Sequence, residues 1–364
     1  MRNKTDAELS RRFYALNTYV AVLLLLTIAV SIFQFGAKAW QGDRQLGFIL
    51  GGDRHRDGWN QSQSQGIEAA CRAMNYDLIM RDQVPALETA ETVHEIVGKG
   101  AKVIFVVNNC SKETLGNLSR QYPNVQFYTL DPVNGFPNVV QYGAQLVDME
   151  YLAGMLAGLN TKSNVVGYIA PAPSPETHQY VNAFTLGVQR TNPHAEVLLT
   201  WTGSFDNPAA ESKAVMTLRA ERADTLCYYQ IGSTIPDTAQ FSGMDFIASH
   251  EAYPKHSHYL GFVKVNWRAF YIDLLRNYGK QTAISRRIVR FRPIVDFELG
   301  KNLSPRQISV METARYEAGL GKPVFIGEIY DRNGILRCSA NEAIAYDSMQ
   351  QMDWLVRGVR VIGN

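Results

Sequence analysis

A chain of 364 residues exceeds one ordinary domain and is long enough for two, each with its own hydrophobic core. Hydrophobic residues make up 46% of the chain and charged residues 19%, a globular composition that excludes a largely disordered protein. The formal net charge of +2 gives no support to a nucleic-acid partner. The four cysteines (Cys71, Cys110, Cys227 and Cys338) are too scattered for a disulfide framework or a zinc site. We expect them to be buried thiols, and we expect no metal or other cofactor.

Residues 1–40 differ in composition from the rest of the chain. The run at 19–35 carries no charge, and with its flanks it approaches the ~20 residues that a helix needs to cross a bilayer. Four Lys and Arg residues precede it, which predicts a cytoplasmic N-terminus, a single-pass anchor in the cell membrane and an extracytoplasmic body. The alternative is a signal peptide cleaved near Ala39, which would give a secreted or periplasmic protein.

From residue 41 on, short apolar runs alternate with amphipathic stretches, the pattern of parallel βαβ units. We expect a first lobe at 41–145, a second lobe at 146–290, and a C-terminal segment at 291–364 that returns across both. In the first lobe, strands are expected at 46–50, 77–80, 103–107 and 125–130, and helices at 61–74, 86–98 and 112–121.

A predicted helix at 147–159 leads into the second lobe. Its strands are expected at 165–170, 196–200, 225–229, 244–249 and 259–265, and its helices at 178–191, 209–220 and 267–278. In the C-terminal segment, the Asp-Arg-Asn-Gly sequence at 331–334 predicts a hairpin turn. The sequence therefore predicts an α/β protein of two Rossmann-like lobes.

Candidate ligand-binding residues come from the loops after the predicted strands. In open parallel sheets ligands bind beyond the carboxyl ends of the strands, and two such lobes facing each other form a closing cleft. The first of these loops offers carboxylates for ligand hydroxyls, a flat indole and an amide. The candidates are Asp53, Asp57, Trp59 and Asn60 after the first strand, Asn108 and Asn109 after the third, Asp131 after the fourth, and Tyr229, Gln230, His250 and Glu251 in the second lobe.

Several candidates also have a purely structural interpretation. Asp57 and Asn60 suit the N-cap of the following helix, and Trp59 could be a packed aromatic residue. Asn108 and Asn109 could satisfy backbone groups of their loop. The sequence contains no dinucleotide-binding GxGxxG, Walker, GxSxG or HExxH motif, so we predict no catalytic residue and no metal ligand.

A series of segments carries a resemblance to a known family. They are Trp59-Asn60-Gln61 followed by Gly66, VDMEYLAGMLAG at 147–158, NAFTLGVQRTNPHAEV at 182–197, WTGSFDNPAAE at 201–211, and the closing segments FIGEIYDRNG at 325–334 and MDWLVRGV at 352–359. In this order they resemble the basic membrane protein family of bacterial solute-binding proteins, typified by purine-nucleoside-binding lipoproteins. The resemblance runs from about residue 46 to the C-terminus.

The resemblance implies a type I periplasmic-binding fold with a hinge and a ligand cleft. It also implies a ligand whose base stacks on an aromatic ring while its ribose hydroxyls meet carboxylates and a lysine. It gives Trp59 the stacking position and Asn60 the contact to the base. Asp53 or Asp57 would stand for the aspartate of the first loop, and Lys264 lies within one residue of the family's lysine.

The sequence departs from the family pattern at two places. The first loop is shorter and carries Arg54, His55 and Arg56. In the second lobe, His250 and Glu251 stand where the resemblance leads us to expect an aspartate. The additional positive charge at the cleft mouth favours a phosphorylated or otherwise anionic ligand.

The expected function is that of an extracytoplasmic solute-binding protein that is not an enzyme and closes on a small nucleoside-like ligand. Its expected partner is an ABC permease, and the alternative is a membrane sensor, for which the chain would be the tethered ligand-binding subunit. A nucleoside-processing enzyme that uses Asp53, Asp57 and Glu251 is less favoured, because no pattern marks carboxylates at a catalytic distance. A DNA-binding regulator is disfavoured, because the N-terminal segment is an apolar run rather than a helix-turn-helix.

Overall fold

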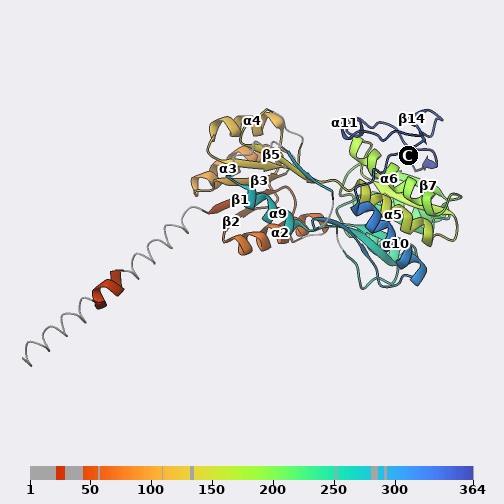
Figure 1. Ribbon diagram of the computed structural model, residues 1–364, viewed down its shortest axis with the longest axis horizontal. Helices are drawn as coiled ribbons and strands as arrows, with labels where there is room; N and C mark the ends of the chain where they lie inside the picture. Colours follow the sequence, from red (N-terminus) through yellow and green to blue (C-terminus); the bar gives the residue numbers. More distant parts are fainter. Residues whose placement is uncertain are drawn as a thin grey trace, which may run out of the picture.

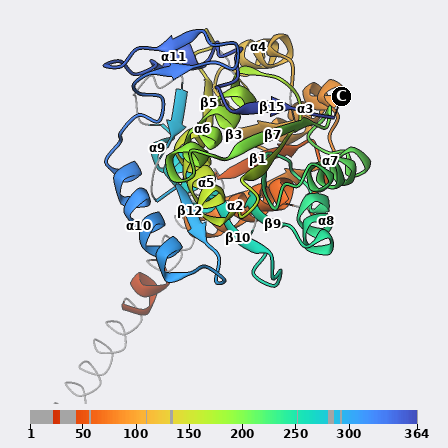
Figure 2. The ribbon, with the colours of Figure 1, turned by 90° about the vertical axis from the view of Figure 1, so that its right-hand side faces the viewer.

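The computed structural model describes residues 22–28, 44–55, 58–108, 110–131, 135–250, 252–279, 286–290 and 293–363. Two lobes lie side by side (Figure 1), and each is built on a mostly parallel β-sheet that is covered by helices. Figure 2 shows the molecule from the side of lobe 2. The predicted α/β class is therefore confirmed.

The predicted membrane anchor is described only in part. Of the apolar run at 19–35, residues 22–28 form exposed helix, and the remainder lies outside the described residues. Among the residues that the structure covers, no helix combines the length and the apolar character that crossing a bilayer requires.

Lobe 1 contains a six-stranded sheet with the order β11-β5-β4-β3-β1-β2, in which all neighbours are parallel. The central strands are almost continuously apolar because helices cover both faces of the sheet. The strands are β1 (Gln45–Leu50), β2 (Asp77–Arg81), β3 (Val103–Val107), β4 (Gln126–Thr129), β5 (Val139–Ala144) and β11 (Arg286–Val289). The covering elements are α2 (Gly58–Met74) and α9 (Trp267–Asn277) on one face, and α3 (Thr89–Gly98) and α4 (Lys112–Gln121), with the short η1 (Ala86–Glu88), on the other.

Lobe 2 contains a seven-stranded sheet with the order β12-β10-β9-β8-β6-β7-β15, in which only β12 is antiparallel to its neighbour. Its strands are β6 (Val165–Ala170), β7 (Glu196–Trp201), β8 (Thr225–Tyr228), β9 (Asp245–Ser249), β10 (Tyr259–Val265), β12 (Val295–Leu299) and β15 (Val359–Val361). Its helices are α5 (Val147–Asn160), α6 (Pro175–Thr191), α7 (Pro208–Ala220), α8 (Thr234–Ser242), α10 (Pro305–Gly319) and α11 (Tyr346–Met349).

A small hairpin of β13 (Ile329–Tyr330) and β14 (Leu336–Cys338) lies in the C-terminal segment. Its turn is the predicted one, because Asp331 begins it and accepts hydrogen bonds from the backbone N–H groups of Asn333 and Ile335 at 2.8 and 2.9 Å. Arg337 pairs with the same carboxylate at 2.8 Å. The Asp-Arg-Asn-Gly signal therefore predicted a real turn.

The lobes are not continuous in sequence, which corrects the predicted division at 145 and 290. Helix α9 packs against α2, and β11 pairs with β5, so both belong to lobe 1 although they lie within 146–290. Conversely, β12, α10 and β15 of the C-terminal segment belong to lobe 2. The chain thus crosses between the lobes three times, after β5, after β10 and after β11. The crossings are tied together, since Gln145 N–H donates to the Val289 carbonyl at 2.8 Å and Asn266 N–H to the Ile294 carbonyl at 2.7 Å.

Helices α5 and α6 cross with their backbones in contact. A Cβ atom on Gly154 would lie 1.9 Å from the carbonyl oxygen of Phe184, and one on Gly187 would lie 2.0 Å from that of Tyr151. No side chain fits at either position, because the neighbouring atoms belong to rigid helix backbone. The glycines of the two motif segments at 147–158 and 182–197 therefore serve the packing of lobe 2.

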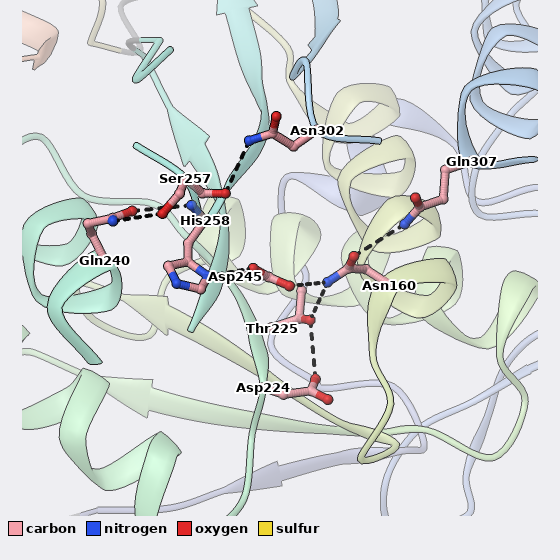
Figure 3. A network of polar contacts seen from close by, with 9 residues as sticks. All are labelled: Asn160, Asp224, Thr225, Gln240, Asp245, Ser257, His258, Asn302 and Gln307. Carbon is pink, nitrogen blue, oxygen red and sulfur yellow. Dashed lines mark hydrogen bonds and ion pairs between the residues drawn. The ribbon is translucent and has the colours of Figure 1, made fainter. Parts of the chain in front are cut away.

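A network of polar side chains lies in lobe 2 at the amino ends of its strands (Figure 3). Asn160 at the end of α5 donates to Asp245 at 2.9 Å and to Thr225 at 3.0 Å, and it accepts from Gln307 of α10 at 3.2 Å. The His258 ring nitrogen Nδ1 lies 2.8 Å from the same Asp245 carboxylate. These contacts connect α5, β8, β9 and α10, so this edge of lobe 2 forms one connected unit.

All four cysteines are free and buried, as predicted. Burial raises the pKa of each thiol above its ordinary value, and it raises that of Cys71 to about 12. The thiols are therefore apolar packing groups at physiological pH.

Candidate functional site

A cavity of about 780 Å³ lies between the two lobes, at the carboxyl ends of their strands. Its lining includes residues that follow β1, β3 and β4 of lobe 1 and β7, β8 and β9 of lobe 2. In lobe 1 the neighbouring strands β1 and β3, and in lobe 2 the neighbouring strands β6 and β8, are followed by connections that run to opposite sides of the sheet. The loops after each pair therefore diverge and leave a crevice at the carboxyl ends of the strands. The volume falls in the range of small-molecule sites, roughly 300–1,000 Å³.

The lobe 1 wall of the cavity carries two amides from adjacent loops. Asn60 lies in the first turn of α2, and its side chain makes no hydrogen bond to any described residue. Its amide packs on Gly52, where a Cβ atom would lie 2.3 Å from Nδ2. Asn108 follows β3 and donates through Nδ2 to Thr89 at 2.7 Å and to the Val84 carbonyl at 3.3 Å. Its Oδ1 is buried without a partner among the described residues. Both amides are therefore able to bind a ligand.

Trp59 and Asp131 complete this wall. The half-buried Trp59 lines the cavity, and its backbone N–H donates to the Ile231 carbonyl of lobe 2 at 3.5 Å, so the start of α2 touches both lobes. Asp131 lines the cavity after β4, and burial raises the pKa of its carboxyl group. The wall thus offers a flat apolar surface beside polar acceptors.

The lobe 2 wall is aromatic and is centred on Tyr229. The rings of Tyr180 and Phe205 meet it edge to face, with centroid distances of 4.8 and 5.7 Å, and His250 lies at 5.7 Å. All four residues line the cavity. Edge-to-face contacts fix ring orientation, so this wall is an ordered surface for a planar ligand.

Glu176 brings a carboxylate into the cavity from the first turn of α6. The helix begins there because Ser174 forms a capping box with Thr177 and Pro175 occupies the first turn. Glu176 is exposed to the cavity, and its Oε1 accepts a hydrogen bond from the Tyr180 hydroxyl at 3.1 Å. The surrounding protein removes bulk water from this carboxylate, and this desolvation raises its pKa.

His250 presents a neutral imidazole. Its backbone has a φ of 65°, an uncommon conformation for a residue other than glycine, and the ring lines the cavity. Burial lowers the pKa of His250 to about 4, so the ring carries no charge at neutral pH. Its Nδ1 is buried and has no hydrogen-bond partner among the described residues. The ring can therefore donate or accept one hydrogen bond to a ligand, according to its tautomer.

Gln145 lies at the first crossing between the lobes and is 6% exposed. Neither its Oε1 nor its Nε2 has a partner among the described residues. Together with Asn108 and His250, it gives the cavity four buried polar atoms without protein partners. Leaving such an atom unsatisfied costs about 1–3 kcal/mol, so the arrangement suits a ligand that supplies the missing hydrogen bonds.

Three of the predicted residues do not line the cavity. Asp53 accepts a hydrogen bond from the backbone N–H of His55 at 2.8 Å and so shapes its own turn. Gln230 is buried and donates to the Thr202 hydroxyl. Lys264 pairs with Glu298 at 2.8 Å where β10 meets β12, because the two side chains share one exposed face of that antiparallel pair. The predicted Asp57, Asn109 and Glu251 lie outside the described residues.

The described part of the positive charge predicted for the first loop is also not in the lining. Arg54 directs its guanidinium toward His55 Nε2 at 3.1 Å and Met80 Sδ at 3.5 Å, and neither Arg54 nor His55 lines the cavity. Arg56 lies outside the described residues. The cationic side chain that the described lining does contain is Arg286 of β11.

The sequence reasoning missed many of the polar and aromatic lining residues, among them Gln145, Tyr180 and the five considered next. Glu176, Phe205 and Asp206 follow β6 and β7, so the rule of strand carboxyl ends finds them when it is applied to every strand. Arg286 and Tyr346 lie on β11 and α11, two elements that the sequence analysis left unassigned.

The chain resembles known proteins in family pattern, in sequence and in fold. The sequence model of the Bmp family, described as "ABC transporter substrate-binding protein PnrA-like", matches residues 44–236. A purine-binding protein of Brucella abortus is 22% identical over 349 residues, which cover 92% of this chain and 98% of that protein.

Two solved structures share the fold at low identity. One is a transcriptional activator of the comK gene from Bacillus halodurans, with a TM-score of 0.67 and 17% identity over 76% of this chain and 99% of that one. The other is a solute-binding protein of an ABC transporter system from Conexibacter woesei, with a TM-score of 0.63 and 15% identity over 76% of this chain and 96% of that one. These structures establish the two-lobed binding-protein fold.

Proposed function

The chain belongs to the Bmp family of PnrA-like ABC transporter substrate-binding proteins, and from this premise we propose that its ligand is a purine nucleoside or a closely related compound. The family is one of solute-binding proteins rather than enzymes. The purine ligand named for the Brucella relative supports the proposal, because that similarity extends over nearly the whole chain.

The observation that carries the proposal is the combination of flat and polar groups in one cavity. Trp59 faces the cavity from lobe 1, and Phe205 and Tyr229 face it from lobe 2. Stacking on such rings contributes about 1–3 kcal/mol per base. The unpaired atoms of Asn108, Gln145 and His250 match the donors and acceptors on the edge of a purine.

The carboxylates suit the sugar of a nucleoside. Asp131, Glu176 and Asp206 line the cavity, and ribose hydroxyls are donors that carboxylate oxygens accept. A ligand held by both walls stabilises the closed arrangement by its differential affinity for the two states. We infer that closure, rather than chemistry at the ligand, is the functional event.

The test is a thermal-shift screen of the purified full chain against purine bases, purine nucleosides, pyrimidine nucleosides and sugars. A ligand at a hundredfold excess over its dissociation constant adds about 2.7 kcal/mol of stability, which is readily measured. We expect stabilisation by purine compounds and recovery of the unchanged compound by chromatography. Stabilisation by sugars alone, or consumption of the nucleoside, would contradict the proposal.

For the partner, we propose an ABC permease, with a membrane sensor as the alternative. The family assignment supports the permease. Crosslinking of the full chain in native membranes, with and without a purine ligand, distinguishes the two by the identity of the captured protein. Capture of a histidine kinase or another signalling protein in place of a permease would favour the sensor.

We further propose that residues 19–35 anchor the chain in the membrane with the body outside the cytoplasm. The uncharged run and the basic residues before it support this orientation. Extraction of membranes at alkaline pH followed by N-terminal sequencing is the test. Retention of the intact chain in the membrane supports an anchor, and a soluble chain that starts near Ala39 supports a cleaved signal.

A further inference from the structure

A smaller cavity of about 310 Å³, here called the annex, adjoins the main cavity. It is lined by Gln145, Arg286, Ile288, Arg290 and Tyr346. All of these except Arg290 also line the main cavity, so the two spaces are adjacent and share a wall. The annex is far larger than the space one water molecule needs, and it can therefore hold a polyatomic group.

The two arginines of the annex differ in how their charge is balanced. Arg290 forms a bidentate ion pair with Asp148, with Nη2–oxygen distances of 2.9 and 3.0 Å and an Nε–oxygen distance of 3.1 Å. Asp148 is buried, so this pair is fixed in place. Arg286 contacts no carboxylate among the described residues, and its partner is Tyr346. One positive charge in the annex is thus balanced and one is not.

The contact between Arg286 and Tyr346 leaves most of the guanidinium available. One Nη2–H donates to the Tyr346 hydroxyl, and the guanidinium carbon lies 4.6 Å from the centre of the Tyr346 ring. A guanidinium has five N–H donors in a planar fork, so the others remain free to bind a planar or tetrahedral anion. The tyrosine supports the arginine without neutralising it.

This contact also joins the two lobes. Arg286 belongs to β11, which pairs with β5 at the edge of the lobe 1 sheet. Tyr346 begins α11, which packs with α6 in lobe 2 and lies across from the lobe 1 sheet in Figure 1. A ligand group in the annex would therefore touch both lobes as well as the crossing segment that carries Gln145.

Gln145 is an independent sign of a ligand. Its side chain lines both cavities, it is buried, and its Nε2 has no hydrogen-bond acceptor among the described residues. An anion would accept a hydrogen bond from this amide and from Arg286 at once. A charge-assisted hydrogen bond from a guanidinium is roughly twice as strong as a neutral one.

From these contacts we propose that the annex binds a phosphate group, so that the preferred ligand is a purine nucleoside monophosphate. The proposal rests on the proposed function, because the base and sugar would occupy the main cavity. Arg286 lines both cavities, whereas Asp131, Glu176 and Asp206 line the main cavity only, so these carboxylates are separate from the annex. That separation matches a ligand with hydroxyl donors in the middle and an anion at one end.

The experiment compares adenosine, adenosine 5′-monophosphate and inorganic phosphate by thermal shift and calorimetric titration on the purified full chain. The variant is Arg286→Gln, and the matched control is Arg287→Gln on the same strand, whose guanidinium pairs with Asp273 at 2.9 Å outside the cavity lining. Arg286→Lys is the second variant, because it keeps the charge but loses the fork. The melting temperature of each variant without ligand shows whether it is folded.

We expect the wild type and Arg287→Gln to bind the monophosphate at least tenfold more tightly than adenosine, and Arg286→Gln to lose this preference. Arg286→Lys should keep part of it. Stabilisation of the wild type but not of Arg286→Gln by inorganic phosphate alone would show that the annex takes free phosphate too. If adenosine binds as tightly as its monophosphate and phosphate alone has no effect, the annex proposal is wrong while the proposed function stands. Binding of none of the three ligands would overturn both.

Discussion

Glu150 provides a sharp test of the energetics of lobe 2. It lies in the first turn of α5, is completely buried, and accepts a hydrogen bond from the Tyr168 hydroxyl at 3.0 Å. The Cys227 thiol lies 3.9 Å from the same oxygen, and the other carboxylate oxygen has no partner among the described residues. No cation among the described residues compensates it, and burial raises the pKa of Glu150 to about 8.

The direction of the pH effect follows from proton uptake. The native state holds this proton up to about pH 8, whereas the unfolded chain loses it near pH 4.5, the ordinary value for a glutamate. The stability that the bound proton provides is therefore complete below about pH 4.5 and is lost as the pH rises to about 8. Each pH unit in that window corresponds to about 1.4 kcal/mol, so the free energy of unfolding should fall by about 4 kcal/mol between pH 5 and pH 8.

The substitution Glu150→Gln should remove this contribution, because the amide has nearly the same shape and does not titrate. The measurement is urea unfolding followed by circular dichroism at pH 5, 6, 7 and 8, with the exposed Glu317→Gln as the control for the same chemical change. The slope should flatten in Glu150→Gln and stay unchanged in Glu317→Gln. Equal slopes in wild type and Glu150→Gln would mean that the buried carboxylate is already ionised at neutral pH, which would refute the reasoning.

Three further predictions concern the cavity and the packing of lobe 2. Trp59→Ala should weaken purine-nucleoside binding by about 1–3 kcal/mol in calorimetric titration, which is the range for stacking on an aromatic side chain. The control Phe241→Ala, on the surface of α8, should leave the affinity unchanged. Equal affinities for wild type and Trp59→Ala would exclude stacking. Lys264→Met should leave the same affinity within about twofold, because its ammonium pairs with Glu298 away from the lining, and a tenfold loss would return this lysine to the site. Gly187→Ala should lower the free energy of unfolding by about 1–3 kcal/mol or more in urea titration, since the added carbon meets helix backbone, and Gly319→Ala, where the space is open, should be neutral or slightly stabilising.

The regular part of the fold could be predicted because its signals are local. Buried parallel strands such as β3 read as unbroken apolar runs, and the structure has a strand at each of the nine predicted positions. The elements that escaped prediction have weaker patterns. Strand β5 is only half-buried, α8 has a proline inside it, and α10 buries only Met311 and Ala314. The start of α10 was nevertheless readable, because Ser304 and Gln307 have the spacing of a capping box.

Lobe membership and much of the site could not be predicted from local sequence patterns. The local sequences of α9 and β11 do not indicate to which lobe these elements belong, because their packing partners α2 and β5 lie more than a hundred residues away. Arg286 and Tyr346 meet only because β11 returns to lobe 1 while α11 stays with lobe 2. In contrast, Trp59, Asn60 and Asn108 follow strands with clear patterns, and they do line the cavity, although their contact with a ligand remains a prediction.

The buried thiols make the chain suitable for site-specific fluorophore labelling, by which motion of the lobes can be measured. Thiol-reactive dyes attack the exposed thiolate, and the four native cysteines are buried with raised pKa values, so they should label slowly. Leu87 of lobe 1 and Phe241 of lobe 2 are 97% and 90% exposed, and cysteines placed there would carry a donor and an acceptor fluorophore. The wild-type background then needs no cysteine removal, and energy transfer between the dyes would report opening and closing one molecule at a time.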